Sequence, residues 1–251
     1  MLPPHSTAQV SSDESTALPA TSHSSRPLRG PALCGLAGVL ILGVYFGIPV
    51  PQPGPDATIK QISDFATHYS TLLMVGGGLQ VTGALLACLF FLGLIHLAHG
   101  MSRLAGLVAL FGTATLFATA LIEAVLGMAT SIATSSGHPE AAVVCWIVQG
   151  VFVHVFPIGP APIIFLAIGM LLVSPSPVIV LPRAVGYLAL ILGVAFEAVG
   201  LLGLLIPAVT AVILVLLIAQ EVWIATASIF LLIRRRGTPG ASVKERAIAV
   251  S

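Results

Sequence analysis

Three glutamates lie inside long apolar runs, where a charged side chain is costly. Glu123 lies in FATALIEAVLGMAT, Glu197 lies in a second EAV triplet, and Glu221 follows in another run. A carboxylate at the centre of a membrane-spanning helix costs roughly 2.5–3.5 kcal/mol on insertion scales, so each acid needs a partner. Acids in such positions can hold a proton, bind a cation or line a water-filled route.

The polar side chains nearest these acids in predicted depth offer few fixed counter-charges. The same broad layer contains Gln80, Gln149, Gln220 and His154. Only His154 among them can become a cation, and no lysine or arginine lies centrally in any of the apolar runs. Fixed ion pairs therefore cannot neutralise all three glutamates. We expect the acids to be protonated, to bind a cation or to face water.

Small residues accompany the acids at helical spacing. Glu123 shares a stripe with Gly112 and Gly127, and Glu197 lies between Gly193 and Gly200. Such stripes let helices approach closely, so the acids are predicted to lie on packing faces. This pattern fits protonated glutamates that hydrogen-bond within helix contacts. It fits a proton, cation or substrate route equally well, and it leaves metal-dependent catalysis as a third alternative.

Three prolines interrupt the fourth apolar run in the sequence FPIGPAPIIF. Pro157, Pro160 and Pro162 each remove a main-chain donor and crowd the preceding turn, which predicts a kink or break. A broken helix close to His154 is a device that some transporters use for a site at mid-membrane. Proline kinks also occur in membrane helices that transport nothing.

Composition identifies lipid as the main solvent of the chain. The 251 residues are 57% apolar and 8% charged, with a mean hydropathy of +1.07, whereas soluble domains carry about 25% charged residues. A net charge of +1 argues against a nucleic-acid partner. Three scattered cysteines fit neither disulfides nor a zinc site, and His96 with His99 lacks a third ligand. No catalytic residue, metal site or cofactor is predicted.

Six apolar runs are long enough to cross a bilayer, which takes about 20 residues. The predicted spans are 31–50, 70–97, 104–131, 141–173, 184–206 and 208–233. The segment DATIKQISDFATHYS before the second span has apolar residues on one helical face and is predicted to be an interfacial helix capped by Asp56. The expected fold is an all-α, polytopic six-helix bundle forming one domain (31–236) in a lipid bilayer.

The arginines predict the orientation of these spans. Arg26, Arg29, Arg103, Arg183 and the triplet Arg234–Arg236 flank one side, and Lys60 is the cation of the opposite loops. The positive-inside rule therefore places both termini in the cytoplasm. Residues 1–30 are rich in Ser, Thr and Pro and are predicted to be a disordered tail. Residues 237–251 form a second cytoplasmic tail.

A weak internal repeat is also present. RLAGLVAL and RAVGYLAL are each followed by EAV, which indicates either a parallel duplication or chance similarity within a narrow alphabet. The six-helix layout, the turns ending in Arg-x-x-Gly (103–106 and 183–186) and the glutamate of the third helix resemble bacterial multi-pass proteins grouped under domains of unknown function. The resemblance implies a bacterial inner-membrane location, no established activity and no site residues.

Two main functions follow from these residues. The first is a small permease or a proton- or cation-coupled carrier that uses Glu123, Glu197, Glu221 and His154 around the helix break. It would act as a homo-oligomer, because six helices enclose little volume. The alternative is a non-transporting membrane scaffold or partner protein, in which the acids are structural. An intramembrane metalloenzyme is the third hypothesis.

Overall fold

A computed structural model describes residues 29–48, 50–54, 56–174, 181–206, 209 and 211–233, and these form helices joined by short connections. The helices are α1 (Arg29–Phe46), α2 (Ile59–His68), α3 (Ser70–Leu97), α4 (Leu104–Ser135), α5 (Pro139–Ile158), α6 (Pro160–Val173), α7 (Arg183–Leu205) and α8 (Ala211–Ile233). A single 3₁₀ turn, Gly100–Ser102, precedes α4. The predicted C-terminal tail, Arg234–Arg236 and all but two residues of the predicted N-terminal tail lie outside the described residues.

Within the described residues, six helical segments are long and apolar enough to cross a membrane. They are Arg29–Gly47, Ser70–Leu97, Leu104–Ser135, Pro139–Val173, Arg183–Leu205 and Val212–Ile233, with α5 and α6 together making the fourth. The prediction of an all-α protein with six candidate crossings is confirmed. Large apolar side chains such as Leu40, Leu104 and Leu205 are 70–80% exposed, as expected where lipid replaces water around a bundle.

Two helix ends differ from the predicted bounds for local reasons. α1 ends at Phe46, short of the predicted residue 50, because Pro49 and Pro51 follow and the residue before a proline is driven out of the helical region. α4 continues to Ser135, four residues beyond the predicted end. There Gly137 adopts φ 78°, and the N–H of His138 donates to the carbonyl of Ala133 at 2.9 Å. This glycine-based cap ends α4.

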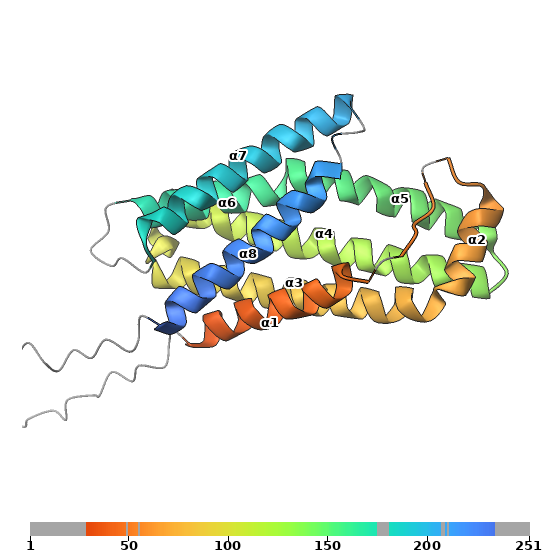
Figure 1. Cartoon of the computed structure of the whole chain (residues 1–251), viewed down its shortest axis with the longest axis horizontal. Coiled ribbons are helices and arrows are strands. Elements are labelled where there is room, and N and C mark those ends of the chain that lie inside the picture. Colours follow the sequence, from red (N-terminus) through yellow and green to blue (C-terminus); the bar gives the residue numbers. More distant parts are fainter. Residues whose placement is uncertain are drawn as a thin grey trace, which may run out of the picture.

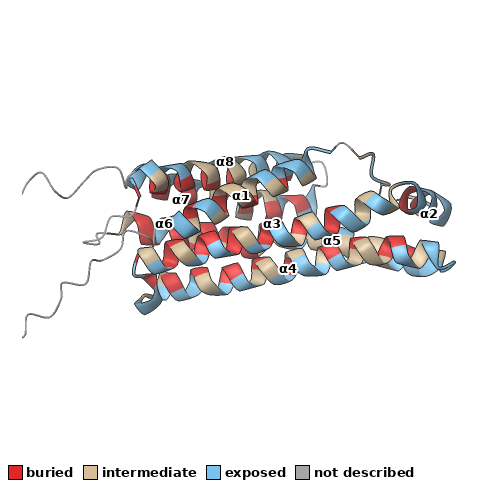
Figure 2. Ribbon diagram, turned by 90° about the horizontal axis from the view of Figure 1, so that it is seen from below, coloured by how far each residue is buried: buried red, intermediate tan, exposed pale blue. Residues whose placement is uncertain are grey.

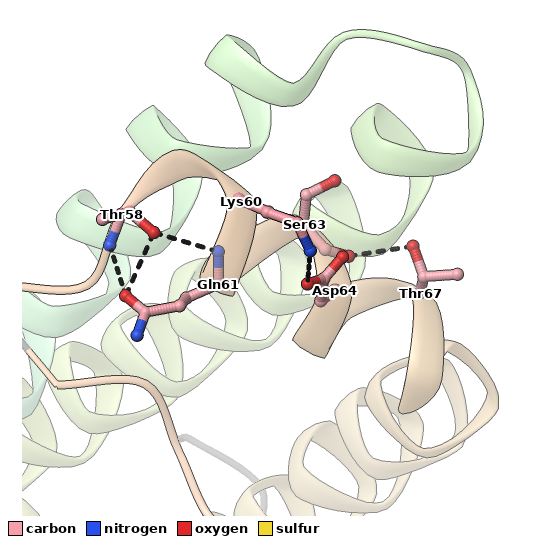
Figure 3. Close-up of polar contacts among 6 residues, drawn as sticks. All are labelled: Thr58, Lys60, Gln61, Ser63, Asp64 and Thr67. Carbon is pink, nitrogen blue, oxygen red and sulfur yellow. Dashed lines mark hydrogen bonds and ion pairs between the residues drawn. The ribbon is translucent and has the colours of Figure 1, made fainter.

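The amphipathic segment before α3 forms α2, with a start different from the predicted one. Thr58, and not Asp56, caps the helix: the Gln61 N–H donates to Thr58 Oγ1 (3.3 Å), and the Thr58 N–H donates to Gln61 Oε1 (2.8 Å) (Figure 3). The reciprocal pair satisfies two donors that a helix start leaves free. Ile62, Phe65 and Ala66 form the buried face of α2.

The helices run along one long axis, with the two described chain ends together. The start of α1 and the end of α8 lie at one end of the bundle, and α2 lies across the other (Figure 1). α3, α4 and α5 continue past the end of α1 toward α2. At 1.5 Å per residue, α4 is about 48 Å long and α1 about 27 Å. The α2 end is therefore built from fewer helices than the end that holds the chain ends.

The core lies in the half of the bundle near the chain ends (Figure 2). Phe91 stacks on Trp223 at 6.3 Å between ring centroids, and Phe165 meets Trp223 edge-on at 5.3 Å. Trp223 Nε1–H donates to the carbonyl of Val185 (2.9 Å), which satisfies the buried indole and joins α8 to α7. This aromatic core fixes α3, α6, α7 and α8 relative to one another.

Candidate functional site

Glu123 meets polar side chains from two neighbouring helices. The side-chain amide of Gln80 on α3 lies beside its carboxyl group. Gln80 is buried and Glu123 is half-buried. Tyr45 of α1 lies within electrostatic range of Glu123, and its Cε2 is 3.0 Å from the position that a Cβ on Gly76 would occupy. The absence of a side chain at Gly76 therefore lets the tyrosine ring pack closely against α3.

Gln149 of α5 adds a fourth polar side chain beside the same face of α4. Its Nε2 lies 3.3 Å from the position of a Cβ on Gly127, and Gly127 is one helical turn beyond Glu123 on the same face of α4. Gln149 Oε1 is buried and has no hydrogen-bond partner within the described part of the chain. We refer to Tyr45, Gln80, Glu123 and Gln149 as the outer polar cluster. It joins α1, α3, α4 and α5.

The cluster lies toward the α2 end of the bundle. Tyr45 is the last residue but one of α1, so Glu123 is level with the end of that helix. At 1.5 Å per residue, Glu123 is about 29 Å along α4 from Leu104. Glu123 therefore lies in the part of α4 nearer to α2, beyond the midpoint of the helix.

Glu197 lies in a different helix contact, beside the interruption between α5 and α6. A Cβ on Gly193 would meet Leu166 of α6 (2.7 Å from its Cγ), and one on Gly200 would meet Pro157 (3.0 Å from its main-chain oxygen). Since α6 and α7 are antiparallel, Glu197 is level with the first turn of α6. The first turn of a helix carries partial positive charge, which favours a carboxylate beside it.

The structure places the proline-rich interruption at Gly159. α5 ends at Ile158, Gly159 has φ −113° and ψ −87°, and α6 begins at Pro160. The N–H of Gly159 donates to the carbonyl of Val155 (3.0 Å). Pro160 and Pro162 have no N–H group, so the carbonyls of Phe156 and Ile158 lose the donors that a continuous helix would supply.

Glu221 lies in a third contact, between α8 and α1. Gln220 Nε2–H donates to Glu221 Oε1 at 3.4 Å, while Glu221 Oε2 is buried without a partner among the described residues. Ser228 is two turns further along the same face of α8 and packs against Gly35 of α1. Glu221 therefore faces the contact between α8 and α1.

The structure does not bring the predicted polar layer together. His154 is exposed on α5, where its Nδ1 lies 3.0 Å from the carbonyl oxygen of Gly150. Within the described residues, no hydrogen bond or ion pair joins any two of Glu123, Glu197, Glu221 and His154. Gln80 and Gln149 do lie with Glu123. Tyr45 was not predicted, because nothing in its own segment shows that another helix places an acid against it.

The glycines beside Glu197 give a test of the α6–α7 contact. We expect Gly193→Leu to lower the free energy of unfolding by about 1–3 kcal/mol, because overpacking forces neighbouring backbone apart. The new side chain would meet Leu166 N at 2.9 Å, where no rotamer can relieve the clash. Thermal denaturation in detergent measures the effect. Gly150→Leu is the control, since a Cβ there meets nothing within 4 Å. Equal stability of the two variants would contradict the packing.

Comparison with known proteins adds no homologue: no family model matches the chain, and neither a curated protein nor a solved structure is significantly similar to it. The chemistry available to the site is therefore that of its own side chains. A carboxyl group, a phenol and two amides from four helices offer oxygen ligands and hydrogen-bond partners, and one buried amide oxygen has no partner in the part of the chain that the structure describes.

Proposed function

We propose that the protein is a proton- or cation-coupled membrane carrier whose coupling site is the outer polar cluster. The observation that carries the proposal is that Tyr45, Gln80 and Gln149 from three helices lie around Glu123 of a fourth, with the buried Oε1 of Gln149 unpaired among the described residues. No lysine or arginine lies centrally in any of the six spans to neutralise Glu123. A proton or a small cation is the counter-charge that remains.

The cluster offers suitable chemistry for both states of a coupling cycle. Carboxylate, amide and phenol oxygens are hard ligands, which suit alkali and alkaline-earth cations better than soft transition metals. When Glu123 is charged, the oxygens of Glu123 and Gln149 can share a cation. When Glu123 is protonated, it becomes a hydrogen-bond donor and Gln149 Oε1 is an acceptor one helical turn away.

α5 is the element that can expose and cover the cluster. Of its described side chains, only Ala142 and Pro157 are buried, whereas ten of the 14 residues of α6 are buried. The junction at Gly159 separates the loosely packed α5 from the firmly packed α6. Pivoting of α5 about this junction would move Gln149 relative to Glu123. Broken helices with a site at the break allow such alternating exposure in transporters.

The arginines support an orientation for this carrier. Arg29, Arg103 and Arg183 lie at the starts of α1, α4 and α7, at the end of the bundle opposite α2. The positive-inside rule makes that end cytoplasmic, so α2 and the outer polar cluster lie toward the outside. We assign the protein to a bacterial inner membrane with both termini in the cytoplasm, and propose that it works as a homo-oligomer.

A scaffold without transport activity is the second candidate, and the separation of the acids favours it. Glu197 and Glu221 each lie in their own helix contact, flanked by Gly193 and Gly200 in one case and partnered by Gln220 in the other. Polar side chains at close helix contacts can strengthen helix association without moving any solute. The scaffold reading predicts that substitution of every glutamate by glutamine leaves assembly intact.

The carrier proposal is tested with purified protein in sealed vesicles that contain a pH-sensitive dye. A membrane potential is imposed with valinomycin and potassium, with and without a sodium gradient. We expect proton or sodium flux above that of protein-free vesicles, measured by the dye and by radioactive sodium. Flux equal to the protein-free background under both conditions, from protein that is folded by circular dichroism, would contradict a coupled carrier.

Fixing α5 should stop this flux. We expect a bifunctional thiol cross-linker between Phe65→Cys and Trp146→Cys, in a chain whose native cysteines are replaced by alanine, to lower the flux at least tenfold. The two rings lie 5.2 Å apart between centroids, and α2 leads directly into α3, so the bridge ties α5 to α3. The control bridge is Gly38→Cys with Leu86→Cys, which joins α1 to α3, since a Cβ at position 38 would lie 3.3 Å from the Cβ of Leu86. Equal flux with both bridges would show that α5 does not move.

A further inference from the structure

An open groove of about 540 Å³ lies at the α2 end of the molecule, and we refer to it as the cavity. Its volume falls within the roughly 300–1,000 Å³ of small-molecule sites, and its broad opening would leave one face of a ligand exposed. One side is formed by residues 51–54, 56 and 57, and the other by α2 and Tyr69. The lining residues are Pro51, Gln52, Pro53, Gly54, Asp56, Ala57, Gln61, Asp64, Phe65, His68 and Tyr69. The outer polar cluster contributes none of them.

One face of α2 lines this cavity. Gln61, Asp64, Phe65 and His68 recur at three- to four-residue spacing, so they share one side of the helix. Phe65 also reaches the bundle, where its ring contacts Trp146 of α5. The capping box at Thr58 fixes the first turn of α2, including the backbone of Gln61 (Figure 3). The α2 residues that line the cavity are therefore fixed in position by the helix.

The lining combines acids with aromatic rings. Asp56 and Asp64 contribute two carboxylates, and no lysine or arginine lines the cavity. The ring of Tyr69 lies 5.2 Å from that of Phe65 and 4.6 Å from that of His68, measured between centroids. A cation is attracted both to the carboxylates and to the faces of the phenylalanine and tyrosine rings. An anion would meet repulsion from both.

An ammonium group already occupies part of this arrangement. Lys60 Nζ forms an ion pair with Asp64 Oδ2 (Figure 3), although Lys60 does not line the cavity. The two side chains are 83% and 65% exposed. Exposed pairs of this kind contribute little stability, so an incoming ammonium can compete for the same carboxylate. The pair shows how Asp64 receives an ammonium donor.

We propose that this cavity binds an organic ammonium ion, such as an aromatic or aliphatic amine. The ammonium pairs with Asp56 and Asp64, and the organic part packs against Phe65, Tyr69 and the proline wall. This recognition goes beyond the coupled carrier and does not depend on it, because the cavity and the outer polar cluster share no residue. The binding assay can therefore succeed where flux fails, and the reverse.

Benzylamine is the probe, and benzyl alcohol is its uncharged counterpart. Each is titrated into the purified full-length chain in detergent at neutral pH. Binding is followed by calorimetry and by the fluorescence of Trp146, whose ring contacts the cavity residue Phe65. We expect benzylamine to bind at least tenfold more tightly than benzyl alcohol. We also expect Trp146→Phe to remove the fluorescence change while the calorimetric signal stays.

Two further variants test the charge of the cavity, one by removing its carboxylates and the other by removing the neighbouring ammonium group. Because exposed ion pairs are weak, we expect Asp56→Asn combined with Asp64→Asn to weaken benzylamine binding several-fold, and Lys60→Met to strengthen it by a smaller factor by removing the competing ammonium. Glu140→Gln is the matched control, because Glu140 is an exposed acid at the same end that does not line the cavity. Circular dichroism checks the fold of each variant. Equal binding of amine and alcohol, no binding of either, weaker binding by Lys60→Met or an equal loss in Glu140→Gln would each overturn the proposal.

Discussion

Vesicles that contain the Glu123→Gln variant should lose at least nine-tenths of the proton or sodium flux of the unmodified protein. Glutamine has the shape of glutamate and can still pair with the amide of the neighbouring Gln80, so the helix contact survives. It can neither release a proton nor carry the negative charge that attracts a cation. The loss would therefore report on the chemistry of the carboxyl group. Dye and radioactive sodium measurements on equal amounts of folded protein give the comparison.

Glu197→Gln and Glu221→Gln are the matched controls for this experiment. Both remove an acid from an apolar span, but neither residue lies in the outer polar cluster, so we expect flux within about twofold of the unmodified protein. Infrared spectroscopy adds an independent measurement, since sodium addition should convert a carboxylic acid band to a carboxylate band only where Glu123 is present. Loss of flux in Glu197→Gln alone would move the coupling site to the α5–α6 junction. Full flux in all three variants would favour the scaffold.

The largest effect on stability is expected from Gly106→Ala in the first turn of α4. A methyl group there would overlap the main-chain carbonyl of Gly100 in the preceding 3₁₀ turn. The Gly100 atoms are backbone, and the position of the new Cβ is fixed by the backbone of residue 106. No side-chain rotation can therefore relieve the overlap, and the connection between α3 and α4 must shift. We expect a loss of about 3 kcal/mol in the free energy of unfolding, at the upper end of the usual range for overpacking.

Thermal denaturation of the detergent-solubilised variant measures this loss. Gly78→Ala provides the control, because it makes the same chemical change within α3 at a position with nothing within 4 Å of a new Cβ. The control should match the unmodified protein or exceed it slightly, since alanine favours helix more than glycine does. If Gly106→Ala denatures at the same temperature as Gly78→Ala, the close approach at Gly100 is not present.

Much of the fold followed from the sequence because the bilayer restricts the alternatives. Buried main-chain groups in lipid must bond within their own segment, so each apolar run of sufficient length becomes a helix. Helix ends were harder to predict. Thr58, and not Asp56, caps α2 because the side chain of Gln61, at the third helical position, accepts a hydrogen bond from the Thr58 N–H. The end of α4 depended on Gly137, which lies beyond the apolar run.

The sequence predicted how deep in the bundle each candidate residue lies, but not which of these residues lie together. Counting residues along each run places Gln80, Glu123, Gln149 and His154 in one broad layer. Depth does not fix the direction in which a helix turns its side chain, and that direction depends on packing against other helices. The packing turns Gln80 and Gln149 toward the Glu123 face of α4 and leaves His154 exposed. It also brings in Tyr45, which has no acid near it in the sequence.

The interruption at Gly159 also has a consequence for biosynthesis. α6 has 14 residues, about 21 Å of helix, which is too short to cross a hydrocarbon core of about 30 Å by itself. The insertion machinery must therefore release residues 139–173 into lipid as one unit. Gly193 and Gly200, which hold α7 against both sides of the interruption, are synthesised only afterwards. The final geometry of the break thus forms late, when α7 has been synthesised and packs against α5 and α6.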